Sequence, residues 1–305
     1  MYNFTTRFML PIYASEGKHV QTSGHIMMMA IMFTLVSFVY LNFVPYIDPT
    51  NVKQTSLQVL QRQNKSDTNI RVFEGRDVTD GEYPYVIVLI ISDNDFTKYQ
   101  RVCTGSMIKE TWGLTAAHCF KYSKKRKYSV FYDNFTESPM NTGIYVPVIK
   151  MIVHPAYLSS PIKEANNDVG LFRSENVPKK SYAVLLAAEY STLVGLPVVY
   201  VGGGDTKMLH SYKDETRPLQ LGEATIIHCD KEIIQIHRII ICLAPKCSNR
   251  LEIPWHGDSG GPLIFDGKII GVFSFSSKKK ITQIGYTPVS PFTDWIHYVV
   301  NDKEP

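Results

Sequence analysis

The stretch that decides the fold is Gly257–Pro262, which reads GDSGGP. Glycines on both sides of Ser259 allow a tight turn and let a substrate backbone come close. The backbone N–H groups of Gly257 and Ser259 can then point at one atom, which is the geometry that stabilises an oxyanion in acyl transfer. Asp258 is left for another partner. Taken alone, the stretch also fits an ordinary glycine-rich turn with an exposed serine.

Two stretches nearer the N-terminus supply partners for a reactive serine. Leu114–Cys119 reads LTAAHC and contains His118, and Asn167–Leu171 reads NDVGL and sets Asp168 in an apolar context. A histidine that is oriented by a buried carboxylate can act as the base for a serine nucleophile. Alone, His118 could be a buried histidine beside a cysteine and Asp168 a capping residue. Their order along the chain with the GDSGGP stretch favours catalysis.

With these three motifs, the chain resembles the chymotrypsin/trypsin-like serine protease family from about Val72 to the C-terminus. The resemblance implies an all-β fold of two six-stranded antiparallel β-barrels with a C-terminal helix, and residues 291–297 look like that helix. Short Val, Ile, Tyr and Phe runs between turn residues, such as 145–149 and 196–201, independently indicate an all-β barrel or sandwich.

The resemblance also implies the role of each motif residue. Ser259 would attack the scissile carbonyl, His118 would take its proton and pass it to the leaving amine, and Asp168 would orient the imidazole. Gly257 and Ser259 would form the oxyanion hole. The expected function is a serine endopeptidase that acts on proteins or peptides, and this chemistry implies no metal and no organic cofactor.

Segments before Val72 indicate secretion or anchoring. Residues 1–25 are predicted to be a non-globular tail, and residues 26–44 contain no charge and are long enough to cross a bilayer. This segment is either a cleaved signal or an uncleaved membrane anchor, with the catalytic part outside the cell in both cases. The polar residues 45–71 fit a linker or propeptide. Sequons at Asn64 and Asn134 fit a glycoprotein.

An activation cut is predicted after Arg71. The resemblance implies that a trypsin-like protease cuts here and frees the amino group of Val72. This group would insert into the protein and pair with Asp258, and the pairing would order the oxyanion loop. An ordinary Arg-Val pair in a strand is the alternative. Because all five cysteines lie beyond Arg101, no disulfide would hold the two pieces together, and the cut would release the enzyme.

The specificity pocket departs from that of trypsin. The resemblance places Ile253 at the pocket base, where a trypsin-like enzyme carries an aspartate, so a cationic side chain would meet an apolar floor. Ser274, Phe275 and Ser276 match the strand that pairs with the substrate, and the serine at 274 is expected to touch the acid of the triad. Ser276 and Ile284 replace glycines of the pocket walls. We expect a small or medium apolar residue before the scissile bond.

Cysteines fit the same resemblance, which pairs Cys103 with Cys119 and Cys229 with Cys242. Trp255 stands where the family has a pocket cysteine, and residues 277–280 also lack the partner. Cys247 is left over, and three states remain open: a free thiol, a bond to another chain, or partial replacement of the lost cysteine. Disulfides imply an oxidising compartment.

Composition excludes some classes of protein. The net charge of +4 is too small to indicate nucleic-acid binding, and neither zinc-finger spacing nor a phosphate loop is present. The basic runs 121–127 and 278–280 fit solvated loops, with polyanion binding as the alternative. The predicted function allows two further partners. These are protein protease inhibitors and, through residues 26–44, a membrane. A protease-like binding or regulatory protein with a closed pocket is the competing function.

Overall fold

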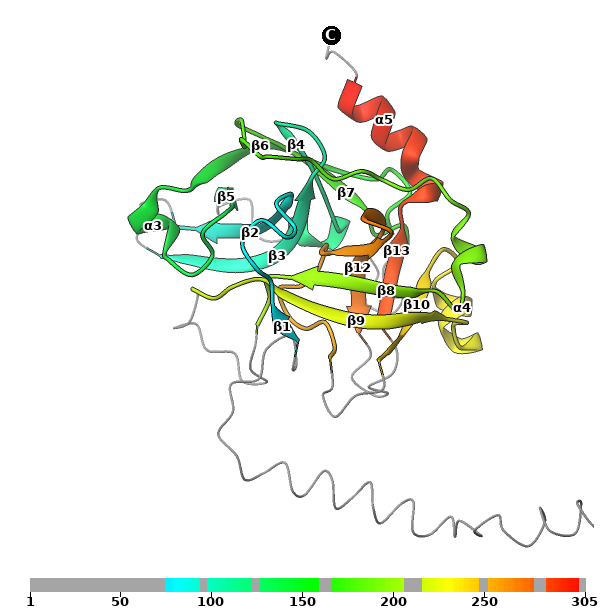
Figure 1. Ribbon diagram of the computed structural model, residues 1–305. Coiled ribbons are helices and arrows are strands. Elements are labelled where there is room, and N and C mark those ends of the chain that lie inside the picture. Colours follow the sequence, from blue (N-terminus) through cyan, green and yellow to red (C-terminus); the bar gives the residue numbers. More distant parts are fainter. Residues whose placement is uncertain are drawn as a thin grey trace, which may run out of the picture. The chain divides into compact units, whose positions relative to one another are not determined.

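The computed structural model describes residues 75–93, 98–121, 127–158, 166–205, 216–246, 252–276 and 284–301. Contacts divide the chain into Met1–Asp67 and Thr68–Pro305, and every described residue belongs to the second unit (Figure 1). The tail 1–25, the apolar segment 26–44 and the linker 45–71 lie outside the described residues. So do Asn64, Arg71, Val72, Cys247 and the lysines at 278–280. No helix in the described ranges has the length and apolarity to cross a membrane.

The first half of the described chain forms a closed antiparallel barrel. Its strand order is β2-β3-β4-β7-β6-β5, with each strand paired to its two neighbours. The strands are β2 (Val86–Ser92), β3 (Tyr99–Met107), β4 (Trp112–Thr115), β5 (Lys127–Phe131), β6 (Tyr145–Val153) and β7 (Gly170–Ser174).

The second half forms the other barrel. In its seven-stranded sheet, β8 pairs with both β9 and β11, which closes six strands, and the short β1 adds to the outside of β9. The strands are β1 (Arg76–Asp77), β8 (Pro197–Gly202), β9 (Gln220–Ile227), β10 (Ile241–Pro245), β11 (Pro262–Phe265), β12 (Lys268–Ser276) and β13 (Ile284–Pro288). The predicted fold of two six-stranded antiparallel barrels is therefore confirmed.

Helices are short and lie between or after the strands. The C-terminal helix α5 (Thr293–Asn301) follows a 3-10 turn, η4 (Ser290–Phe292), so it begins two residues later and ends four residues later than the predicted 291–297. It buries Ile296 in the same cluster as Val289 and Phe292. The others are α3 (Pro139–Thr142), α4 (Lys231–Ile236), η2 (Ala117–Lys121) and η3 (Tyr190–Leu193).

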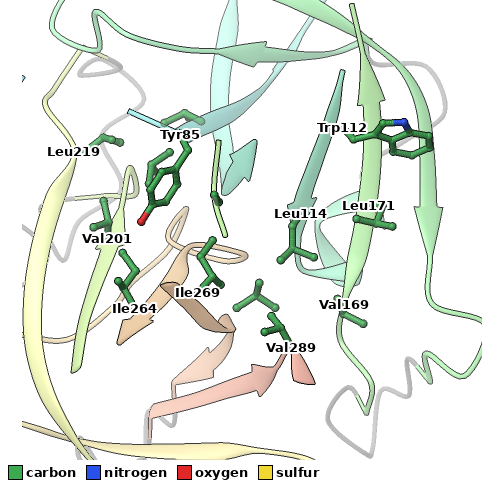
Figure 2. Close-up of a cluster of buried hydrophobic side chains, with 14 of the residues drawn as sticks. Tyr85, Trp112, Leu114, Val169, Leu171, Val201, Leu219, Ile264, Ile269 and Val289 are labelled. Atoms are coloured by element: carbon green, nitrogen blue, oxygen red, sulfur yellow. The ribbon is translucent and has the colours of Figure 1, made fainter. Parts of the chain in front are cut away.

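Strand β2 shows how the two barrels share a core. Side chains alternate along a strand, and here one face of β2 lies in the first barrel's interior with Val130 and Phe172. The other face lies in a cluster that also contains Leu114, Ile264 and Val289, which come from both barrels and the C-terminal segment (Figure 2). The run of six apolar residues at 86–91 in β2 follows from this burial on both faces, since neither face meets water.

We expect the shared cluster to carry much of the stability. Leu114 is fully buried in it, so Leu114→Ala should lower the free energy of unfolding by about 2–5 kcal/mol through lost burial and a residual cavity. Leu158 is 65 % exposed, and Leu158→Ala should change the free energy by less than about 0.5 kcal/mol. Denaturant unfolding of both variants tests this, and an equal loss in the two would contradict it.

Candidate functional site

Both predicted disulfides are present. Cys103–Cys119 joins β3 to η2, the short helix that carries His118. Cys229–Cys242 joins the segment before α4 to β10. The sulfurs of Cys103 and Cys119 and a ring nitrogen of His118 lie within 4.8 Å of one another. Because both sulfurs are used in the disulfide, they cannot act as thiolate ligands, and the cluster is not a metal site.

His118, Asp168 and Ser274 lie together at the junction of the barrels. The Nδ1–H of His118 donates to Oδ2 of Asp168 at 2.7 Å, and the backbone N–H of His118 donates to Oδ1 at 2.9 Å. The hydroxyl of Ser274, on β12, donates to the same Oδ2 at 2.6 Å. Since a carboxylate only accepts, the proton of the neutral imidazole is held on Nδ1, and Nε2 is left as the basic nitrogen.

The position of Asp168 follows from a glycine. Asp168 lies two residues before Gly170, the first residue of β7. A Cβ atom on Gly170 would lie 2.8 Å from the ring of Phe120 and 3.2 Å from Cα of Ala117. A side chain here would force the Phe120 ring or Ala117 to move, so the glycine lets the start of β7 pack closely on η2, the helix that carries His118.

Ser259 lies beside the histidine segment because its turn packs on β3 and β4. The Ser259 carbonyl accepts a hydrogen bond from Thr104 N at 2.8 Å, and Sγ of Cys119 lies 3.6 Å from the same oxygen. The next residue, Gly260, has φ +79°, and a Cβ atom there would lie 2.0 Å from Oγ1 of Thr115. The glycine is required for both reasons, since a side chain would be strained and would clash.

Two backbone amides of the turn have no acceptor in the part of the chain that the structure describes. In the described ranges, Gly257 N and Ser259 N donate to no protein acceptor, whereas Asp258, Gly260 and Gly261 donate to Trp255, Phe273 and Asp258. Gly257 has φ +88°, a left-handed conformation that glycine adopts freely. Two donors on one turn beside a histidine, with no acceptor among the described residues, have the chemistry that binding of an oxyanion requires.

Comparison with known proteins gives the family. The family model described as Trypsin matches residues 72–296. The chain belongs to the trypsin family. It is 28% identical over 234 residues to granzyme-like protein 1 of Rattus norvegicus, covering 74% of this chain and 89% of that one. It is 28% identical over 253 residues to chymotrypsin-like elastase family member 1 of Homo sapiens, and the match covers 78% of this chain and 95% of that one.

A solved structure agrees. Neuropsin, a serine protease expressed in the limbic system of mouse brain, matches with a TM-score of 0.59 and 26% identity, over 75% of this chain and 99% of that one. This relative of the trypsin-family chain is thus a serine protease.

Asp258 of this trypsin-family chain is buried, at 2% exposure. Its Oδ1 accepts from Gly204 N at 2.8 Å and its Oδ2 from Trp255 N at 2.7 Å. Burial raises the pKa of Asp258 to about 7, although these hydrogen bonds and the charge of Arg217 act in the other direction. A carboxylate with so high a pKa lacks enough nearby positive charge to compensate for its burial.

Residues predicted to line the pocket divide into two groups. Ile253 and Ile284 belong to one buried apolar cluster inside the second barrel. The Phe275 ring packs elsewhere, stacked on the His237 ring with centroids 4.4 Å apart, and a Cβ atom on Gly285 would come within 2.4 Å of it. Ser276 is half-buried at the end of β12.

Sequence reasoning missed three contributors. Thr104 donates from Oγ1 to the Gly257 carbonyl at 2.8 Å and accepts from Gly203 N at 2.9 Å, which links the first barrel to the turn. Arg101 and Arg217 are buried and bind backbone carbonyls around Gly203 and Gly204. The glycine run 202–204, which follows the predicted apolar run 196–201, is a sequence signal for this contact, but by itself it indicates only a turn. Single arginines carry no pattern that marks them.

The pKa of Asp168 yields a prediction about acid stability. Burial alone would raise this pKa, but the charge of His118 and the hydrogen bonds from His118 and Ser274 outweigh it, so that the pKa is lowered. A lowered carboxyl pKa stabilises the fold above the unfolded value of about 4, and this contribution disappears as pH falls through the folded value.

We therefore expect Asp168→Ala to be less stable than the parent chain at pH 7, with the difference shrinking below about pH 4. Unfolding free energies at several pH values measure it. Asp80→Ala, which alters an exposed carboxylate, is the control. A difference between parent and Asp168→Ala that does not change with pH would contradict the assignment.

Proposed function

We propose that the chain is a serine endopeptidase that hydrolyses peptide bonds through an acyl-enzyme, with His118, Asp168 and Ser259 as its triad. The observation that carries this is the fully buried Asp168 carboxylate bound by both the ring and the backbone of His118. This pair holds the imidazole so that Nε2 is the basic nitrogen, and the GDSGGP turn lies next to it.

The proposed reaction has two halves, formation of the acyl-enzyme and its hydrolysis, and the same groups act in both. Ser259 Oγ attacks the carbonyl carbon while His118 Nε2 takes the hydroxyl proton, and the resulting oxyanion is bound by the N–H groups of Gly257 and Ser259. The C–N bond then breaks, and His118 gives its proton to the leaving amine. A water molecule attacks the acyl-enzyme with His118 again as base, which releases the acid and restores the serine. Ser274 completes the hydrogen bonds of Asp168.

We further propose that the enzyme is made as a zymogen. Cleavage after Arg71 by a trypsin-like protease would create the ammonium of Val72, which would pair with Asp258. The raised pKa of Asp258 supports this, since an ammonium in contact would remove the cost of a buried charge. In this proposal residues 72–305 form the protease domain, residues 45–71 the propeptide or linker, and residues 1–25 the tail.

Location and partners follow from the same proposal. Residues 26–44 would direct the chain to secretion or anchor it with the protease outside the cell, and the two disulfides fit an oxidising compartment. Asn134 lies in a sequon and would carry a glycan. The partners would be protein or peptide substrates, the activating protease and protein protease inhibitors.

For specificity we propose a small or medium apolar residue before the scissile bond. Support comes from Ile253 and Ile284, which lie in one buried apolar cluster and offer no charge for a lysine or arginine side chain. The same observation favours one alternative, a protease-like binding protein whose pocket admits no side chain.

Covalent labelling tests the enzyme proposal. A fluorophosphonate reacts only with an activated serine, so the full chain should be labelled after cleavage at Arg71–Val72 and Ser259→Ala should not be. The uncut Arg71→Gln chain should be labelled far more slowly if the cut orders the site. A folded, correctly cut chain that stays unlabelled would contradict the hydrolase proposal and would favour the alternative, a protease-like binding protein.

Pocket size gives a further expectation. Ile284→Ala should raise kcat/KM for a peptide with Phe before the scissile bond, relative to one with Ala, on the order of tenfold or more, because removed methylenes make room for the ring. Ile270→Ala is the matched control, since Ile270 is buried in the same cluster. Equal changes in the two variants would show that Ile284 does not line the pocket.

A further inference from the structure

The turn that carries Gly257 is held from behind by a second loop. Gly204 donates from its backbone N to Oδ1 of Asp258 at 2.8 Å, and Asp205 donates from its backbone N to the His256 carbonyl at 2.6 Å. The approach is close because glycines face each other, and a Cβ atom on Gly257 would lie 2.8 Å from Cα of Gly204. The direction of one peptide unit in the turn thus depends on the neighbouring loop.

Arg217 binds the neighbouring loop, at Gly204 and Asp205, through two contacts. Its Nε donates to the Gly204 carbonyl at 2.6 Å, and its Nη2 lies 3.2 Å from Oδ1 of Asp205. The side chain is buried, with the residue 8% exposed. A buried guanidinium that binds a carbonyl and a carboxylate in fixed geometry makes strong, directional contacts.

Arg217 is itself anchored to the first barrel. Arg101, on β3, donates from Nη1 to the Arg217 carbonyl at 3.0 Å and from Nη2 to the Phe135 carbonyl at 2.7 Å. The backbone N of Arg217 donates to the same Phe135 carbonyl at 2.9 Å. The guanidinium of Arg217 therefore starts from a fixed backbone position.

We propose that Arg217 is a positioning residue that sets the direction of the Gly257 N–H through two successive peptide units. In a trans peptide the C=O and N–H point in opposite directions. With the Gly204 carbonyl bound to Arg217, the Asp205 N–H is turned toward His256. With the His256 carbonyl bound to that N–H, the Gly257 N–H is turned the other way, where it donates to no acceptor among the described residues.

The far side of Gly257 is also held. Its carbonyl accepts from Oγ1 of Thr104 at 2.8 Å, so both peptide units around Gly257 have one fixed end. Arg217 acts on the unit that carries the candidate oxyanion donor, and Thr104 acts on the next one. This inference rests on the proposed function, because it assigns Arg217 a part in aiming one oxyanion donor.

Arg217→Met tests the proposal, since it keeps an apolar side chain and removes all guanidinium contacts. After cleavage of the full chain at Arg71–Val72, we expect kcat for a peptide substrate to fall about 10- to 100-fold, while KM stays within twofold of the parent value. Outright loss of an oxyanion donor costs roughly 10²–10³ in kcat, and here the donor is displaced and not deleted. Arg217→Lys, which keeps the charge and a donor, should recover part of the loss.

Arg76→Met is the matched control. Arg76 pairs with Glu82 at the surface, through Nη1 and Oε2 at 2.9 Å, and its loss should leave kcat within twofold of the parent. If Arg217→Met fails to fold, Arg217→Lys decides, with kcat expected to fall several-fold at unchanged KM. An unchanged kcat, or a rise in KM alone, in the folded Arg217 variant would overturn the proposal.

Amide hydrogen exchange separates this proposal from the proposed function. Arg217→Met should speed exchange at Gly204 and Asp205, whose N–H groups bind Asp258 and His256, and Arg76→Met should not. This readout needs no activity. A parent chain without hydrolysis would end the enzyme proposal, while unchanged exchange at these two amides in Arg217→Met would end the positioning role.

Discussion

The structure depends on one buried carboxylate at the boundary between the barrels. Asp168 is removed from water, and an ion in such surroundings is tolerated only when its oxygens are well bound. Two donors come from His118 in the first barrel, and the third is Ser274 in the second. Each barrel thus completes the hydrogen bonding of the same ion, and a shift between the barrels would leave the ion partly unbound.

Close packing of backbone on backbone gives the second constraint. The loop 202–204 and the turn 257–261 approach so closely that a side chain at Gly202 or Gly204 would overlap atoms of Asp258. This approach allows hydrogen bonds between main-chain groups, whose directions are set by the planar peptide and not by rotatable side chains. A site that must aim two N–H groups at one atom benefits from such rigidity.

Much of the architecture could be predicted from local sequence. The GDSGGP, LTAAHC and NDVGL stretches led to the family, and with it to the two barrels and both disulfides. The C-terminal helix was predicted too early, because Pro291 and Phe292 form a 3-10 turn before the helix begins. Thr104, Arg101 and Arg217 could not be found, since most of their partners are main-chain carbonyls and amides distant in sequence, which leave no residue pattern. Phe275 was predicted to line the pocket with its neighbours on β12. Regular alternation would place its ring on the same face as Phe273, but the pairing with β13 shifts register between these two residues, and the Phe275 ring stacks on His237.

The shared apolar cluster has a consequence for how such a sequence can change over time. Val86, Val88 and Ile90 face residues of the other barrel, so a larger side chain there would move one barrel against the other and not merely swell one of them. The displacement would be felt at Asp168, whose hydrogen-bond donors come from both barrels. Substitutions in this cluster are therefore expected to be correlated, so that a gain of side-chain volume on one barrel is matched by a loss on the other. The residues inside a single barrel can vary independently of the other barrel.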